Sequence, residues 1–135
     1  MRVMAIDIGD KKIGIALSDA LKMTSQGLET YYRKNKKQDF DYLTALMSKH
    51  EVSTLVVGLP KNMNGTEGPQ AEKAREFAAG INRVSGVEIV FVDERLTTME
   101  AEKMLISGDV SRKKRKNVID KVAANLILQQ YLQRL

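Results

Sequence analysis

Three acidic residues that are far apart in the chain occur where a carboxylate could do chemistry. The first, Asp7, lies in a nearly continuous apolar run from Arg2 to Gly9. Such a run is typical of a central strand that is covered on both faces. An ionised carboxylate in that setting is costly unless a cation or a set of hydrogen-bond donors compensates it. The sequence therefore predicts a compensating partner for Asp7, and a metal ion would be one.

The second acid, Glu94, follows another strand-like run. Residues 87–92 are mostly apolar, and Asp93 and Glu94 come directly after them. Ligands of open α/β sheets bind beyond the carboxyl ends of the strands. If the first strand and the strand at 87–92 are parallel, Asp7 and Glu94 lie at the same edge of the sheet.

The third acid, Asp120, is placed by the pattern of the last predicted helix. Polar residues recur every four positions and predict its solvent-facing side, at Lys121, Asn125, Gln129 and Gln133. Asp120 shares the other face with small and apolar residues, namely Ala123, Ala124, Ile127 and Tyr131. Because residues three and four apart lie on one helix face, we expect Asp120 to point toward the body of the protein.

Together, Asp7, Glu94 and Asp120 predict a metal site made of oxygen ligands. The chain has no cysteine and a single histidine, His50, so thiolate sites are excluded and nitrogen-rich sites are disfavoured. Carboxylate ligands favour Mg²⁺ or Mn²⁺, and three of them suffice for one or two ions together with water and a substrate phosphate. Such ions activate water and stabilise the leaving oxygen at a scissile phosphate, which predicts nuclease chemistry.

Each of the three acids also has an ordinary structural explanation. Asp120 could join Asn117 in capping the last helix, where it would complement the helix dipole. Glu94 could pair with Arg95 on a surface loop, and Asp7 could accept hydrogen bonds from the hairpin backbone. All three explanations must hold together to remove the metal hypothesis.

The positive charge of the chain is concentrated in one place. The formal net charge is +5, and the five consecutive cations of residues 112–116 account for all of it. Such a patch suits a polyphosphate partner, although a solvated loop would look the same. Three further cations are predicted near the acids, where they could contact a phosphate backbone or be ordinary exposed residues. The predicted substrate-binding residues are thus Lys12, Lys61, Arg95, Arg112, Lys113, Lys114, Arg115 and Lys116.

The order of predicted elements indicates an α/β fold. Two strands form a hairpin around the turn 10–12, and a third spans 26–32. The pair Asn35 and Gln38 resembles a capping box for the helix that follows. Strands and helices then alternate: a strand at 52–58, a helix opened by Pro69 and ended by Gly86, a strand at 87–92, a helix from Thr97 to about Gly108, and a last helix from Asn117. Strands joined by helices predict a three-layer domain with a mixed sheet.

Composition limits the class of protein. With 135 residues and 43% apolar content, the chain is expected to form one domain over 1–135, because it shows no repeats and no linker. Its apolar stretches are far shorter than the roughly 20 residues of a membrane span. No basic-then-apolar leader opens the chain, so we expect a cytoplasmic protein that does not enter a membrane.

Four segments of the chain, at residues 7–19, 58–65, 93–98 and 119–124, resemble the motifs of the YqgF/RuvX family, within the ribonuclease H-like superfamily. Residues 7–19 resemble the opening hairpin of the family, 58–65 its middle loop and 93–98 its third motif. The pair 119–120 followed by Ala123 and Ala124 is similar to its last helix. The four occur in the family's order over nearly the whole length.

The resemblance implies a ribonuclease H-like fold, with a five-stranded mixed sheet and helices on both faces. It also implies a metal-dependent nuclease site at Asp7, Glu94 and Asp120. The family is described as maturing the small-subunit (pre-16S) ribosomal RNA precursor, and an older proposal is Holliday junction resolution. A non-catalytic RNA-binding role in ribosome assembly stays open, and the sequence does not reveal an oligomeric state. Asp10 stands where many members carry Thr or another uncharged residue, so a fourth carboxylate could crowd the site.

Overall fold

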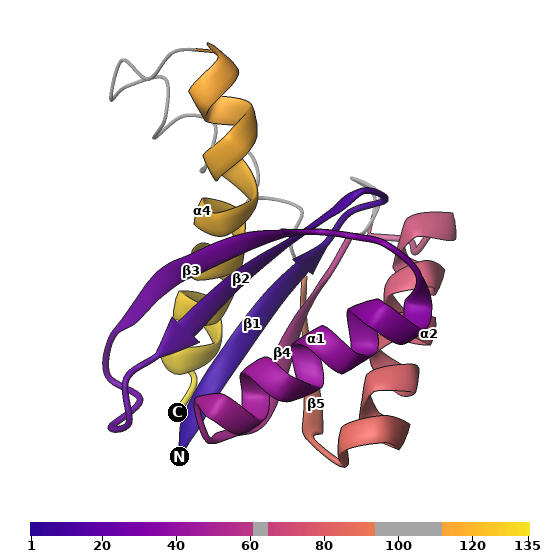
Figure 1. The fold of residues 1–135 in the computed structure, drawn as a ribbon. Coiled ribbons are helices and arrows are strands. Elements are labelled where there is room, and N and C mark those ends of the chain that lie inside the picture. Colours follow the sequence, from indigo (N-terminus) through magenta and orange to yellow (C-terminus); the bar gives the residue numbers. More distant parts are fainter. Residues whose placement is uncertain (61–64, 94–111) are drawn as a thin grey trace.

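The computed structural model describes residues 1–60, 65–93 and 112–135, and for 112–121 it describes the backbone alone. Five strands form one mixed sheet in the order β3-β2-β1-β4-β5. Their bounds are β1 Arg2–Ile8, β2 Lys12–Ser18, β3 Ser25–Tyr32, β4 Val52–Leu59 and β5 Glu88–Asp93. The described helices are α1 Lys36–Lys49, α2 Pro69–Ser85 and α4 Arg112–Leu132 (Figure 1).

The central strand β1 is covered on both faces, as predicted. Its residues from Val3 to Ile6 are at most 1% exposed. It pairs antiparallel with β2 and parallel with β4, and β4 pairs parallel with β5. Strands β1 and β5 therefore run in the same direction. This confirms that Asp7 and Asp93, near the ends of these strands, lie toward the same edge of the sheet.

Helices cover both faces of the sheet, which confirms the predicted three-layer architecture. Alternate residues of β1 enter two separate cores, because successive side chains of a strand point to opposite faces. Met4 and Ile6 pack with the buried residues of α1 and α2. Val3 and Ala5 pack with the buried residues of α4. We call these sides the α1/α2 face and the α4 face.

Several local signals in the sequence have the predicted structural effect. The Asn35 side chain caps α1: its Oδ1 accepts from the Gln38 backbone N–H at 2.8 Å, and its Nδ2 donates to Gln38 Oε1 at 2.9 Å. Pro69 opens α2, and Gly86 ends it in the left-handed region with φ 74°. Capping therefore sets the positions of both helices on the α1/α2 face.

The start of α4 differs from the prediction. The helix begins at Arg112 and not at Asn117, so the basic run forms its first turns and is not a loop. Arginine and lysine are good helix formers, and this outweighs the repulsion between neighbouring cations. The predicted helix from Thr97 to Gly108 lies outside the described residues.

The buried side of α4 is the one that the sequence predicted. Its small and apolar residues are at most 1% exposed: Ala123, Ala124, Ile127 and Leu128. On the predicted solvent side, Gln129 and Gln133 are exposed, whereas Asn125 is half-buried. Within the described residues, no helix is long and apolar enough to cross a membrane.

Candidate active site

Asp7 lies on the α4 face of the sheet, at the carboxyl end of β1. Val3 and Ala5 belong to the core under α4, and strand alternation places Asp7 on the same side. The next residue, Ile8, packs against the core of the α1/α2 face. Asp7 itself is only partly buried. The apolar core under α4 therefore ends at Asp7, at the edge of the sheet.

The neighbours of Asp7 on β2 and β3 leave room for a ligand and supply a cation. Directly opposite Asp7 is Gly14, which has no side chain to cover the carboxylate. Lys12 lies two residues before Gly14 on β2 and on the same face. It pairs with Tyr32 of the edge strand β3. The Lys12 ammonium lies 5.5 Å from the centroid of the Tyr32 ring, and Tyr32 is 58% exposed. A cation and an exposed aromatic ring therefore flank the acid, as in sites that bind phosphates and bases.

Helix α4 crosses this face in the direction opposite to β1. Figure 1 shows its carboxyl end beside the start of β1, and its first turns extending away from the sheet at the other end. Ala124 and Ile127 share one buried cluster with Ala5 of β1 and Val92 of β5. The backbone of residues 112–116 thus belongs to the part of α4 that extends past this cluster (Figure 1).

The remaining predicted site residues fall where the structure gives no side-chain geometry. Glu94, Lys61 and Arg95 lie outside the described residues. Asp120 and the cations of 112–116 belong to α4, where the backbone alone is described. Consequently, no cluster of three or more acids and histidines is found in the part of the chain that is described, and the predicted trio stays a prediction. The backbone N–H of His50 donates to the Leu46 carbonyl oxygen at the end of α1.

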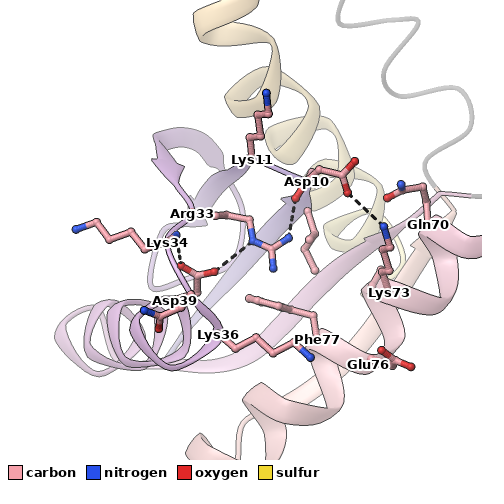
Figure 2. Close-up of a pocket in the computed structure, with 14 residues that line it drawn as sticks. Asp10, Lys11, Arg33, Lys34, Lys36, Asp39, Gln70, Lys73, Glu76 and Phe77 are labelled. Atoms are coloured by element: carbon pink, nitrogen blue, oxygen red, sulfur yellow. Dashed lines mark hydrogen bonds and ion pairs between the residues drawn. The ribbon is translucent and has the colours of Figure 1, made fainter.

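Asp10, the fourth carboxylate considered, is directed toward the other face. It lies in the turn between β1 and β2, and its Oδ1 is 3.7 Å from the Lys73 ammonium of α2. Both side chains are strongly exposed, at 67% and 63%. In this geometry Asp10 belongs to the α1/α2 face and does not crowd Asp7 (Figure 2).

A pocket of about 600 Å³ on the α1/α2 face was not predicted from the sequence. It lies at the carboxyl edge, between the β1–β2 turn, the start of α1 and the start of α2 (Figure 2). Its lining is unusually rich in cations: Lys11, Arg33, Lys34, Lys36 and Lys73. Four of the residues at 33–37 are cationic, which was the one signal for this pocket in the sequence.

A buried carboxylate, Asp39, organises one wall of this pocket. It is 1% exposed and accepts hydrogen bonds from the Tyr31 hydroxyl and the Lys34 backbone N–H, each at 2.9 Å. Burial, and then the hydrogen bond to Asp39, raise the pKa of Tyr31, so its hydroxyl stays a donor. Arg33 Nε lies 3.2 Å from Asp39, and Arg33 Nη1 donates to the Gly9 carbonyl oxygen at 2.8 Å.

Gly9 ties this network to the strand that carries Asp7. Its backbone N–H donates to the Lys12 carbonyl at 2.8 Å, and the Arg33 N–H donates to the Lys11 carbonyl at 2.8 Å. A Cβ at Gly9 would lie only 3.0 Å from that Lys12 oxygen, so the tight turn needs glycine. Three hydrogen bonds therefore fix the turn that follows Asp7: Gly9 to Lys12, Arg33 to Lys11, and the Arg33 side chain to Gly9.

Comparisons with known proteins agree on one family and one fold. The family model RuvX, described as Holliday junction resolvase, matches residues 1–134. A protein of Halalkalibacterium halodurans named "Putative pre-16S rRNA nuclease" is 57% identical, covering 99% of this chain and 97% of its own. A protein of the same name from Carboxydothermus hydrogenoformans is 54% identical, covering 98% and 96%.

Two solved structures share the fold at low sequence identity. RuvC of T. thermophilus, in complex with a Holliday junction substrate, aligns with a TM-score of 0.64 at 14% identity, over 99% of this chain and 96% of that one. The fowlpox virus resolvase, in complex with Holliday junction DNA, aligns with a TM-score of 0.61 at 14% identity, over 99% and 98%. The expected mixed five-stranded architecture is therefore confirmed as that of the resolvases.

Proposed function

Because the chain belongs to the RuvX family, we propose that it is a divalent-metal-dependent endonuclease that processes the precursor of small-subunit ribosomal RNA. Relatives at 57% and 54% identity over nearly the whole chain carry the pre-16S rRNA nuclease name, which supports this substrate. A cytoplasmic location belongs to the same proposal, because bacterial ribosomal RNA precursors are processed there. The chemistry is hydrolysis of a phosphodiester bond at the α4 face.

The observation that carries the proposal is that Ala5 of β1 and Val92 of β5 belong to one core under α4. Ala5 and Val92 are buried in that core, and both strands run toward the same edge. Asp7 follows Ala5 by two residues, and Glu94 follows Val92 by two residues. Two residues advance a strand by about 6.6 Å and return to the same face. We propose that both acids are one such step beyond the core.

Asp120 relates to the same core through the helix. Ala124 is buried in it at 0% exposure, and Asp120 precedes Ala124 by four residues. Four residues of an α-helix return to the same face with a rise of about 6 Å. Because α4 runs opposite to β1, this step leads toward the edge where Asp7 lies (Figure 1). Asp120 and Asp7 would thus lie about equally far beyond the same buried cluster, toward the same edge of the sheet.

The donor chemistry of this proposed trio fits Mg²⁺ or Mn²⁺. All three groups are carboxylates, and the single histidine caps the end of α1 through its backbone. When bound, such an ion supplies charge neutralisation at the scissile phosphate and activation of the attacking water. Asp7 would be the central ligand, because it lies at the end of the buried central strand β1, with Glu94 and Asp120 completing the set. The absence of a side chain at Gly14 leaves the approach from β2 open.

The predicted cations complete the proposal as phosphate contacts. Lys12 lies on the same face as Asp7 and beside the exposed Tyr32 ring, where it can hold a phosphate close to the acid. We assign the same role to Lys61, to Arg95 and to the first turns of α4, which carry Arg112, Lys113, Lys114, Arg115 and Lys116. Such contacts position a strand without reading its bases. The proposed enzyme thus recognises the structure of the substrate more than its sequence.

The experiment compares cleavage of matched RNA and DNA substrates by the wild type and Asp7→Asn. Each is assayed with Mg²⁺, with Mn²⁺ and with a chelator. We expect metal-dependent cleavage by the wild type and none by Asp7→Asn, whose folding should be unchanged or improved because a partly buried charge is removed. The matched control is Asp41→Asn, which removes an exposed carboxylate from α1. Wild-type cleavage by Asp7→Asn would show that the mechanism is wrong.

Resolution of DNA junctions is the second candidate function. The family model carries that description, and two structural neighbours were solved with junction DNA. Resolution needs two cuts in opposed strands, and hence a symmetric dimer. Preferential cleavage of a four-way DNA junction by a protein that sediments as a dimer would favour it. A monomer that cleaves precursor RNA would favour RNA processing.

A further inference from the structure

The basic pocket on the α1/α2 face lies next to the proposed active site along the chain, but on the other side of the sheet. Ile8, Gly9 and Asp10 line it, and they directly follow Asp7. Three residues of extended chain span about 10 Å at most. A strand of duplex nucleic acid rises about 3.4 Å per nucleotide, so about three nucleotides cover this distance. A strand leaving the α4 face across the β1–β2 turn would therefore reach the pocket.

Three cations inside the pocket are placed to meet a phosphate. Figure 2 shows Lys36 of α1 and Lys73 of α2 on different walls of the pocket, with the Arg33 guanidinium above the Phe77 ring and Lys73 directed toward Asp10. Lys11 and Lys34 also line the pocket, but their side chains extend away from it (Figure 2). The cations that matter thus come from three separate elements that only the fold brings together.

The Arg33 guanidinium is held on two sides and keeps its Nη2 amino group for a ligand. Its Nε is paired with Asp39 and its Nη1 with the Gly9 carbonyl. Its central carbon lies 5.1 Å from the centroid of the Phe77 ring, which supports it from below. Within the described residues, Nη2 has no hydrogen-bond partner. A planar donor fixed in this way is well suited to a phosphate oxygen.

The acids of the pocket do not cancel this charge. Asp39 is fully used by its three donors and is buried away from a ligand. Asp10 pairs with Lys73 at 3.7 Å, but both groups are strongly exposed, and such a pair is weak enough to exchange for a phosphate. Glu76 is the remaining acid, on α2. Because α1 also starts at this pocket, its first-turn N–H groups add positive potential.

We propose that this pocket is a second binding site for the nucleic-acid substrate, in which Arg33, Lys36 and Lys73 hold a backbone phosphate about three nucleotides from the cleavage position. The inference rests on the proposed nuclease function, because it takes the strand at Asp7 as its starting point. It extends the substrate contact from the α4 face around the edge of the sheet. The contact carries no base specificity, since only phosphate oxygens are met.

The test measures binding of a short structured RNA as a function of salt, with Asp7→Asn as the parent so that no cleavage occurs. In this background, Lys36→Ala combined with Lys73→Ala should weaken binding and reduce the slope of log affinity against log salt by up to about 0.9, the value for one lost phosphate contact. The matched control combines Lys22→Ala with Lys49→Ala, two exposed lysines outside the pocket. The salt slope of this control variant should stay close to that of the parent, because its two lysines contact no phosphate.

Charge reversal at the same positions separates a specific contact from general electrostatics. Lys36→Glu with Lys73→Glu should reduce the slope further than Lys22→Glu with Lys49→Glu, although both change the net charge equally. Equal slopes for the pocket and control variants would overturn the second site. This failure is distinct from that of the nuclease proposal, which is decided by cleavage with Asp7→Asn alone. Thermal unfolding checks that all variants stay folded, as expected for exposed lysines.

Discussion

Two carboxylates near the same edge of the sheet, Asp7 and Asp39, are treated in opposite ways by the fold. Asp39 is 1% exposed and fully paired: the Tyr31 hydroxyl and the Lys34 N–H donate to it, and Arg33 neutralises it. Asp7 is partly buried at the end of a buried strand and faces Gly14, which leaves space beside it. The first acid is buried in the protein, whereas the second lies at the end of its strand, opposite a glycine.

The difference teaches how the two faces divide the work. On the α1/α2 face, an acid and an arginine build a rigid wall and hold the turn at Gly9. On the α4 face, the buried apolar cluster includes Ala5, two residues before Asp7. We therefore expect mutations in the Asp39–Arg33 network to change stability and mutations of the proposed acids to change turnover.

The largest expected effect is on catalysis at the α4 face. Asp7→Asn, Glu94→Gln and Asp120→Asn should each reduce the cleavage rate by about 10³-fold or more, which corresponds to about 4 kcal/mol of transition-state stabilisation. If the three acids act as one unit, the triple variant should cleave as fast as the slowest of the single variants. If the fold-reduction of the triple variant equals the product of the three single reductions, the acids do not share a site. Single-turnover cleavage measures this.

The next effect is on stability at the α1/α2 face. Asp39→Asn leaves the Arg33 charge without its carboxylate in a largely buried setting, and should lower the free energy of unfolding by about 3 kcal/mol. Urea denaturation measures the change, with Asp41→Asn as the exposed control on the same helix. Cleavage per folded molecule should stay within a few-fold of wild type. A stable Asp39→Asn protein without activity would show that the Asp39–Arg33 network is needed for turnover and not only for stability.

The smallest effect concerns Lys12, which is partly exposed beside Tyr32. Lys12→Ala should reduce the salt slope of RNA binding by about 0.9, the value for one lost phosphate contact. Stability should change little, because the ammonium and the ring meet at the surface. Lys22→Ala is the control. An unchanged slope for Lys12→Ala would remove this lysine from the substrate contact.

Most of the architecture could be predicted from the sequence because local signals and hydrophobic patterns agree. The apolar run of β1, the Asn35 cap, and Pro69 and Gly86 at the ends of α2 all have their expected effect. The start of α4 could not be predicted in this way. A run of five cations suggests a solvated loop, but its residues have high intrinsic helix propensity, and the helix begins at Arg112.

The proposed active site and the basic pocket also differ in how far they could be predicted from the sequence. Asp7 could be identified because a charge inside an apolar run is visible in a single segment. The basic pocket could not, because Arg33, Lys36 and Lys73 become neighbours only when α1 and α2 pack beside the β1–β2 turn. The roles of Glu94 and Asp120, and the extent of the domain over 1–135, stay predictions.

Direct titration with Mn²⁺ tests the central claim most directly, because it detects the ion without any substrate. The wild type and Asp41→Asn should bind Mn²⁺ with the same affinity, and Mg²⁺ should compete. Asp7→Asn, Glu94→Gln and Asp120→Asn should each weaken that binding strongly while the protein stays folded. Unaltered Mn²⁺ binding by all three variants would contradict a shared metal site at the end of β1.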